Sequence, residues 1–136
     1  MILHSIRIGS WRYFVNPVQV GPFSDGLNVL HAPNATGKST LFEALLRGLL
    51  DNHGVSGREV EALQPWGRHL APSVTVEFSH GGTDYRLAKR FLNRPSSDLE
   101  RRENGGFVRL SKGDVADQFV REILTREPAG AWVGAS

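Results

Sequence analysis

The segment from Ala32 to Ser39, Ala-Pro-Asn-Ala-Thr-Gly-Lys-Ser, has the spacing of a phosphate-binding loop, with alanine at the position of the first glycine. The nearly all-apolar residues 27–30 precede it and predict a short strand that is buried on both faces. Apolar residues then recur at helical spacing and predict a helix from Lys38 to about Leu50. Because strand, loop and helix agree, residues 27–51 predict a nucleotide-binding P-loop unit.

Each part of this segment has a physical role in binding a nucleotide with Mg²⁺. Backbone N–H groups from Ala35 through Thr36 to Ser39 are expected to converge on the β-phosphate, assisted by the positive end of the helix. Gly37 allows a tight turn beside the phosphate. The Lys38 ammonium is expected between the β- and γ-phosphates, and the Ser39 hydroxyl on Mg²⁺. Thr40 can reach the α-phosphate.

The alanine at the first loop position is a mild departure from the pattern. That position asks for a small residue where the strand turns into the loop, and alanine is the smallest change from glycine. We therefore expect Ala32 to be compatible with nucleotide binding.

Hydrolysis needs a second acidic residue at the metal and a group that orients the attacking water. P-loop ATPases supply them from an apolar strand that ends in aspartate or glutamate, and no such strand follows in this chain. Residues 73–78 come nearest, but they alternate, and Glu77 is interpreted as a surface position of that strand. We identify no catalytic residue in this sequence.

Two short motifs resemble functional ones but favour a structural role. Residues 110–114, Leu-Ser-Lys-Gly-Asp, are similar to the signature of ABC-type ATPases, yet Ser111 followed by Asp114 is typical of a helix N-cap. Residues 51–54, Asp-Asn-His-Gly, fit the DxxG pattern of GTPases, but they directly follow the predicted helix and indicate its C-cap.

The rest of the chain predicts mixed α and β structure in a single domain over residues 1–136. Residues 1–8 predict a strand that continues through 11–15 and 18–20. An antiparallel part is expected over 73–110, with a hairpin whose strands are 73–78 and 84–92, a polar loop over 93–106 and a strand over 107–110. A closing amphipathic helix is expected over 114–125.

Composition narrows the classes of partner and location. The chain has no cysteine, which excludes disulfides and cysteine-based zinc sites, and no apolar run long enough to span a membrane. We expect a cytoplasmic protein without a membrane partner. Seven basic and three acidic residues lie between Arg86 and Arg109. This excess could contact a phosphate backbone, although a solvated hairpin and loop is the favoured interpretation.

Residues 21–45, "GPFSDGLNVLHAPNATGKSTLFEAL", with the preceding "ILHSIRIGSWRYF", resemble the start of the SbcC/SMC/RecF class of DNA-repair ATPases. The later "VTVEF", glycine turn and "YRLAKRF" are similar to the antiparallel lobe of the same heads. The resemblance implies the N-terminal lobe of an ABC-type P-loop NTPase head. It assigns nucleotide contacts to Asn34, Gly37, Lys38, Ser39 and Thr40. Arg12 corresponds to a basic residue near the phosphates.

The same resemblance implies partners. In that class a coiled coil separates this lobe from a C-terminal ATPase lobe, and two heads enclose ATP between them. We expect the chain to be a fragment of a longer protein, inactive alone, which binds ATP and Mg²⁺ and acts on DNA with a nuclease partner. Two alternatives stay open: a small P-loop kinase with Arg94, Arg101 and Arg102 as lid residues, and a nonhydrolytic nucleotide-binding interaction module.

Overall fold

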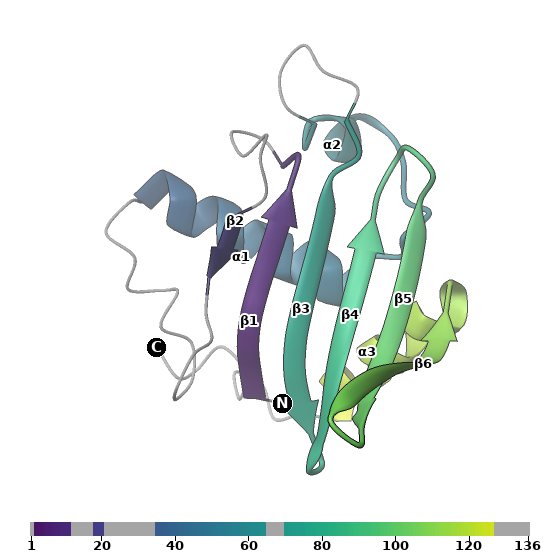
Figure 1. The fold of residues 1–136 in the computed structure, drawn as a ribbon. Helices are drawn as coiled ribbons and strands as arrows, with labels where there is room; N and C mark the ends of the chain where they lie inside the picture. Colours follow the sequence, from purple (N-terminus) through teal and green to yellow (C-terminus); the bar gives the residue numbers. More distant parts are fainter. Residues whose placement is uncertain (1, 12–17, 21–34, 65–69, 127–136) are drawn as a thin grey trace.

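The computed structural model describes residues 2–11, 18–20, 35–64 and 70–126, and of residues 18, 20, 35–39, 41, 42 and 59 it describes only the backbone. Its centre is a single antiparallel sheet of six strands in the order β2-β1-β3-β4-β5-β6 (Figure 1). The strands are β1 (Ile2–Gly9), β2 (Val18–Val20), β3 (Ser73–His80), β4 (Thr83–Arg90), β5 (Ser96–Glu103) and β6 (Gly106–Lys112).

Two helices cover one face of this sheet. They are α1 (Ala35–Leu50) and α3 (Asp114–Arg126), and a third, short helix is α2 (Arg58–Glu61). Helix α1 packs behind β1, β3 and β4, whereas α3 packs behind β5 and β6 and also contacts α1 (Figure 1). No helix of the described residues lies on the opposite face, and none is long and apolar enough to cross a membrane.

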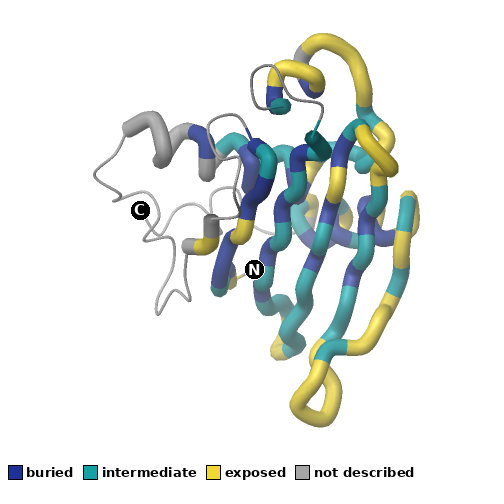
Figure 2. Tube along the Cα trace, turned by 45° about the horizontal axis from the view of Figure 1, so that its top comes forward, coloured by how far each residue is buried: buried dark blue, intermediate teal, exposed yellow. Residues whose placement is uncertain are grey.

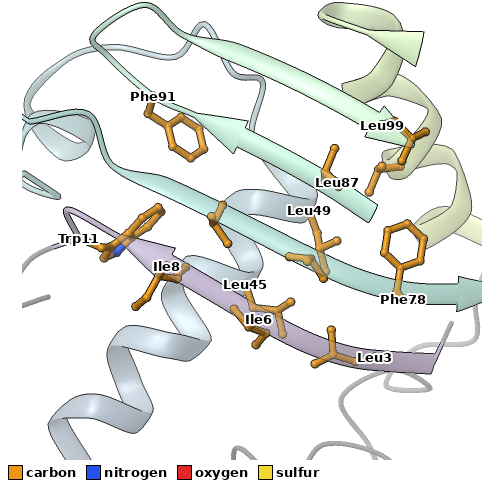
Figure 3. Packing of buried hydrophobic residues seen from close by; sticks show 14 of the residues in the cluster. Leu3, Ile6, Ile8, Trp11, Leu45, Leu49, Phe78, Leu87, Phe91 and Leu99 are labelled. Carbon is orange, nitrogen blue, oxygen red and sulfur yellow. The ribbon is translucent and has the colours of Figure 1, made fainter. Parts of the chain in front are cut away.

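The core forms because the strands alternate between the two faces of the sheet. In β3 Val74, Val76 and Phe78 are buried, and the residues between them are only half-buried. Figure 2 shows buried and half-buried positions along the strands of the sheet. Leu45 and Leu49 of α1 meet this layer (Figure 3). The remaining buried apolar side chains belong to Leu3, Ile6, Ile8, Trp11, Ala44, Val60, Leu63, Leu87, Phe91, Leu99, Ala116, Val120 and Ile123.

Glycines permit two tight features of the fold. Gly81 and Gly82 connect β3 to β4 and both have positive φ, 58° and 81°, which a two-residue hairpin turn of the primed type requires. Gly48 lies where α1 approaches β3 most closely, because a Cβ built at this residue would lie 2.9 Å from Cγ1 of Val74. The predicted hairpin is confirmed, and α1 can approach the sheet this closely only without a side chain at residue 48.

The expectation that residues 93–106 form a polar loop is wrong for most of that range. Residues Ser96–Glu103 form β5, which pairs with β4 on one side and with β6 on the other. Leu99 points into the core and is fully buried. Across the sheet, Glu100 of β5 accepts two hydrogen bonds from Arg86 of β4, at 3.0 and 3.1 Å. Cross-strand ion pairs thus stabilise a strand of low apolar content.

Other boundaries also differ from the expectations. Residues 18–20 do not extend β1 but form β2, which pairs antiparallel with it. Helix α1 begins at Ala35, three residues before Lys38. Ser111 is not an N-cap, because it belongs to β6 and pairs with Leu99, and α3 begins at Asp114 after Gly113 with φ 67°. The closing helix itself is confirmed.

Candidate nucleotide-binding site

The N-terminal end of α1 carries the glycine, lysine and serine of the phosphate-loop pattern. The backbone from Ala35 to Ser39 lies in the first turns of this helix. A helix that begins at Ala35 leaves its first N–H groups without intrahelical partners, and these groups carry the positive end of the helix dipole. This donor set suits an anionic phosphate. The predicted strand 27–30, Ala32, Asn34 and Arg12 lie outside the described residues.

Packing against the sheet fixes the position of α1. Thr40 is 5% exposed, and Ala44, Leu45 and Leu49 are buried on the same side of the helix. Because the helix cannot turn without exposing this apolar side, the direction of its N-terminal N–H groups is fixed as well. Any contact between Thr40 and a nucleotide would be made from a buried position.

A hydrogen bond ties the end of β1 to α1 near the loop. The indole N–H of Trp11 donates to Oε1 of Glu43 at 3.2 Å, and the Trp11 ring meets Phe91 edge-on at 5.9 Å. Trp11 is fully buried, as expected of a core residue. Glu43 is half-buried where it accepts this bond.

A buried network of charged groups joins the C-terminal end of α1 to α3. The Lys89 ammonium of β4 donates to the backbone carbonyl of Asp51 at 2.6 Å and lies 3.0 Å from Oδ1 of Asp117 in α3. Both the Lys89 and Asp117 side chains are 0% exposed. The other oxygen of Asp117 accepts the backbone N–H of His53 at 2.9 Å and lies 2.6 Å from His53 Nδ1. We call these four residues the α1–α3 junction.

Neighbouring residues extend the junction to the surface. The Asn52 side chain donates to Oδ1 of Asp114 at 2.9 Å and accepts the N–H of Gly54 at 2.8 Å. Residues 51–54 were expected to cap α1, and the Asp51 N–H does bond the Arg47 carbonyl at 3.0 Å. The structure shows that the same four-residue turn also contacts the first turn of α3.

Burial and pairing act in opposite directions on the charged groups of the junction. Burial lowers the pKa of Lys89, and the negative charge of Asp117 counteracts that effect only in part. Burial acts to raise the pKa of Asp117, but hydrogen bonds from the His53 backbone and ring and from Ser97, together with the charge of Lys89, outweigh it and lower this pKa. The folded chain therefore favours an ionised Asp117.

The same groups could be mistaken for a metal centre. Ligand atoms of His53, Asp114 and Asp117 lie within 4.8 Å of one another. However, Asp117 already has the buried Lys89 ammonium at 3.0 Å, which would repel a cation. The arrangement is therefore an ion pair with a hydrogen-bonded histidine.

The sequence does contain an indication of this network: two residues of opposite charge occupy positions that face the core. Because alternate residues of a strand face the same side, Lys89 faces the same side as Tyr85 and Leu87. Asp117 lies within the apolar side of α3, with Ala116 and Val120. Opposite charges at two inward positions indicate a buried pair. The spacing does not say that the two residues meet, since that depends on the order of the strands.

Most of the basic excess between Arg86 and Arg109 is neutralised within the fold. Arg86 pairs with Glu100, and this hydrogen bond raises the pKa of Arg86. Arg109 pairs with Asp98 at 3.2 Å, Arg102 lies 3.9 Å from Asp84, and Arg101 pairs with Glu103. Together with buried Lys89, five of the seven basic residues have acidic partners. This pattern favours the structural interpretation over a dedicated phosphate-backbone surface.

Residues 5–129 match the family described as AAA domain, AAA_23. The chain belongs to this AAA-domain family. The match contains the phosphate loop, the junction and all of α3, so the similarity to the family extends well beyond the loop pattern. The predicted mixed α/β fold is confirmed, and the predicted resemblance to an ATPase head is confirmed at the level of an AAA domain.

One solved structure is also similar to this chain. The SMC head domain from Thermotoga maritima is similar at 22% identity, with a TM-score of 0.47, over 98% of this chain and 45% of that chain. The chain thus spans less than half the length of that head domain. No curated protein matches the sequence.

Proposed function

We propose that this chain is the ATP-binding part of an ATPase head that acts in DNA repair or chromosome maintenance. The observation that carries the proposal is the position of the Gly37-Lys38-Ser39 sequence at the N-terminal end of a 16-residue helix fixed against the sheet. Membership of the AAA-domain family supports it. Mg-ATP is the ligand that this combination of donors suits best.

The binding groups follow from the chemistry of the loop. The backbone N–H groups from Asn34 to Ser39 would hold the phosphates, the Lys38 ammonium would neutralise their charge, and the Ser39 hydroxyl would be a ligand of Mg²⁺. Thr40 and Arg12 would add further phosphate contacts. When bound, Mg²⁺ supplies positive charge that stabilises the transferring phosphoryl group.

The partners in this proposal complete the head. A C-terminal ATPase lobe would supply the acidic residue that this chain lacks, and a second head would enclose the nucleotide. DNA and a nuclease would be the further partners, in the cytoplasm. The kinase alternative receives less support, because Arg101 and Arg102 belong to β5 and lie beside acidic residues.

Isothermal titration calorimetry with Mg-ATP tests the proposed site. We expect measurable binding to the 136-residue chain. Lys38→Ala should abolish this binding, because it removes the cation placed between the β- and γ-phosphates. Lys112→Ala is the control, since Lys112 is an exposed residue at the end of β6. An affinity that Lys38→Ala leaves unchanged would refute the assignment.

A further inference from the structure

The α1–α3 junction connects two helices that lie far apart in the sequence. Residues 51–53 form the turn after α1, Lys89 comes from β4 and Asp117 from α3. The network therefore links three parts of the chain that are 28 or more residues apart. Figure 1 shows α3 behind β5 and β6, at the same end of the sheet as the C-terminal end of α1. The phosphate loop is at the other end of this same helix.

The bonds of the junction make the two helices depend on each other. The Asp51 carbonyl belongs to the turn that ends α1, where a cation is favourable. The cation that binds it is Lys89, and the charge that makes a buried Lys89 tolerable belongs to α3. If α3 moved away, Lys89 would lose its counter-charge and His53 would lose its acceptor.

We propose that the α1–α3 junction makes the phosphate-loop helix and α3 open and close as one cooperative unit, so that nucleotide bound at the start of α1 stabilises α3. The second half of this statement rests on the proposed nucleotide site, and the first half does not. Asp51, His53, Lys89 and Asp117 are positioning residues in this role, because they gather at the C-terminal end of α1, whereas Lys38 and Ser39 lie in its first turns.

The charged groups around the junction support a role in coupling two elements. Facing the Lys89–Asp117 pair are His53 from the turn after α1, Ser97 from β5 and Arg121 from α3. Asp114 lies 3.9 Å from His53 Nδ1 but is largely exposed. Among the residues that the structure describes, Lys89 therefore joins β4 to α3 through Asp117, and His53 joins the turn after α1 to the same carboxylate.

The decisive variant removes both charges of the Lys89–Asp117 pair and replaces the two residues with uncharged ones of similar size. Lys89→Met combined with Asp117→Asn leaves no buried charge unpaired, and the asparagine oxygen can still accept the His53 N–H. Arg86→Met with Glu100→Gln is the matched control. It removes another ion pair that also begins on β4, but this pair lies on the opposite face of the sheet and contacts neither helix.

Native-state hydrogen exchange of the 136-residue chain tests cooperativity without a ligand. In the parent chain we expect amides in the last turn of α1 and in α3 to exchange with a shared opening free energy. In Lys89→Met/Asp117→Asn the α3 amides should lose protection relative to α1 by about tenfold, the middle of the range for residues in one network. Independent opening in the parent chain, or unchanged protection in the variant, would overturn the proposal.

Adding Mg-ATP tests transmission. We expect protection to rise in α3 as well as in α1, and the rise in α3 to vanish in Lys89→Met/Asp117→Asn although the nucleotide still binds. Protection of α1 alone would refute transmission and leave the nucleotide site standing. Absence of ATP binding would refute the site instead, and the exchange experiment without ligand would still decide cooperativity. Should the double variant fail to fold, His53→Ala removes only the ring contact and should separate the helices to a smaller degree.

Discussion

Gly48 is the residue at which helix propensity and tertiary packing conflict most clearly. Alanine is favoured over glycine inside a helix by about 1 kcal/mol. Here, however, the added Cβ would lie 2.9 Å from Cγ1 of Val74, and Val74 is itself buried in the core. Neither the helix backbone nor this side chain can yield without disturbing the packing between α1 and β3.

We therefore expect Gly48→Ala to lower the free energy of unfolding, by about 1–3 kcal/mol as for other overpacked cores. Urea unfolding measures the change. Gly106→Ala is the matched control, since a Cβ there meets nothing within 4 Å. A more stable Gly48→Ala variant would show that α1 lies farther from β3 than described.

Asp117 gives a pH dependence with a definite sign. Its pKa in the folded chain is below the ordinary value of 3.8, so its ionised form stabilises the fold at neutral pH. That contribution is complete above 3.8 and is lost as the pH falls through the lower pKa of the folded chain. Asp117→Asn should lower the free energy of unfolding by about 3 kcal/mol at neutral pH, because it leaves Lys89 buried without a counter-charge.

The difference in unfolding free energy between the parent chain and Asp117→Asn should shrink as the pH falls below 3.8. Urea titrations of both chains at a series of pH values measure it, and contributions common to both chains cancel. A difference that stays constant down to the lowest pH would mean that Asp117 is not the ionised group described.

At the scale of elements, β5 depends on a single apolar contact. Leu99 is fully buried, and the strand otherwise presents charged residues or serines. Leu99→Ala should cost about 2–5 kcal/mol of unfolding free energy, the range for truncating a buried leucine. Val108→Ala in β6 is the control, because Val108 is 43% exposed. Urea unfolding measures both losses of unfolding free energy. Equally small losses would contradict the assignment of residues 96–103 to a strand and support the loop that the sequence predicts.

The same strand shows where sequence patterns reach their limit. The hairpin of β3 and β4 was predictable, because Val74, Val76 and Phe78 alternate and two glycines follow. Strand β5 was not, since five of its eight residues are charged and only Leu99 marks its inner face. Its partners, Arg86 and Arg109, are evident only once the register of the neighbouring strands is known.

The candidate site divides in the same way. The phosphate loop is a local pattern and could be found within eight consecutive residues. The bond between Trp11 and Glu43 joins residues 32 positions apart, and the bond between Lys89 and the Asp51 carbonyl joins residues 38 positions apart. Contacts of this kind follow from the strand order, which periodicity along the chain does not specify.

At the scale of the whole molecule, α1 is the element through which the other parts are connected. It contacts β1, β3, β4 and α3, and it carries the phosphate-loop residues at its start. A ligand that fixes the start of α1 should therefore stabilise the entire fold by mass action, in proportion to its concentration relative to its dissociation constant. Binding, in this view, needs only the residues of this chain, whereas hydrolysis needs more.

The carboxylates of α1 and of the turn after it are already engaged. Glu43 accepts the hydrogen bond from Trp11, and Asp51 accepts one from Arg47 at 2.9 Å. Neither is free to serve as the second acidic group at the metal that phosphoryl transfer requires. We therefore expect the 136-residue chain to bind Mg-ATP without measurable turnover.

A phosphate-release assay over hours measures this turnover, with Lys38→Ala as the control for contaminating ATPases. Release that is equal in both chains belongs to a contaminant and agrees with the expectation. A steady rate in the parent chain that disappears in Lys38→Ala would show that the chain supplies its own catalytic carboxylate. That carboxylate would then have to lie outside α1. Acidic residues elsewhere in the chain, beginning with Glu77 of β3, would be the next to substitute.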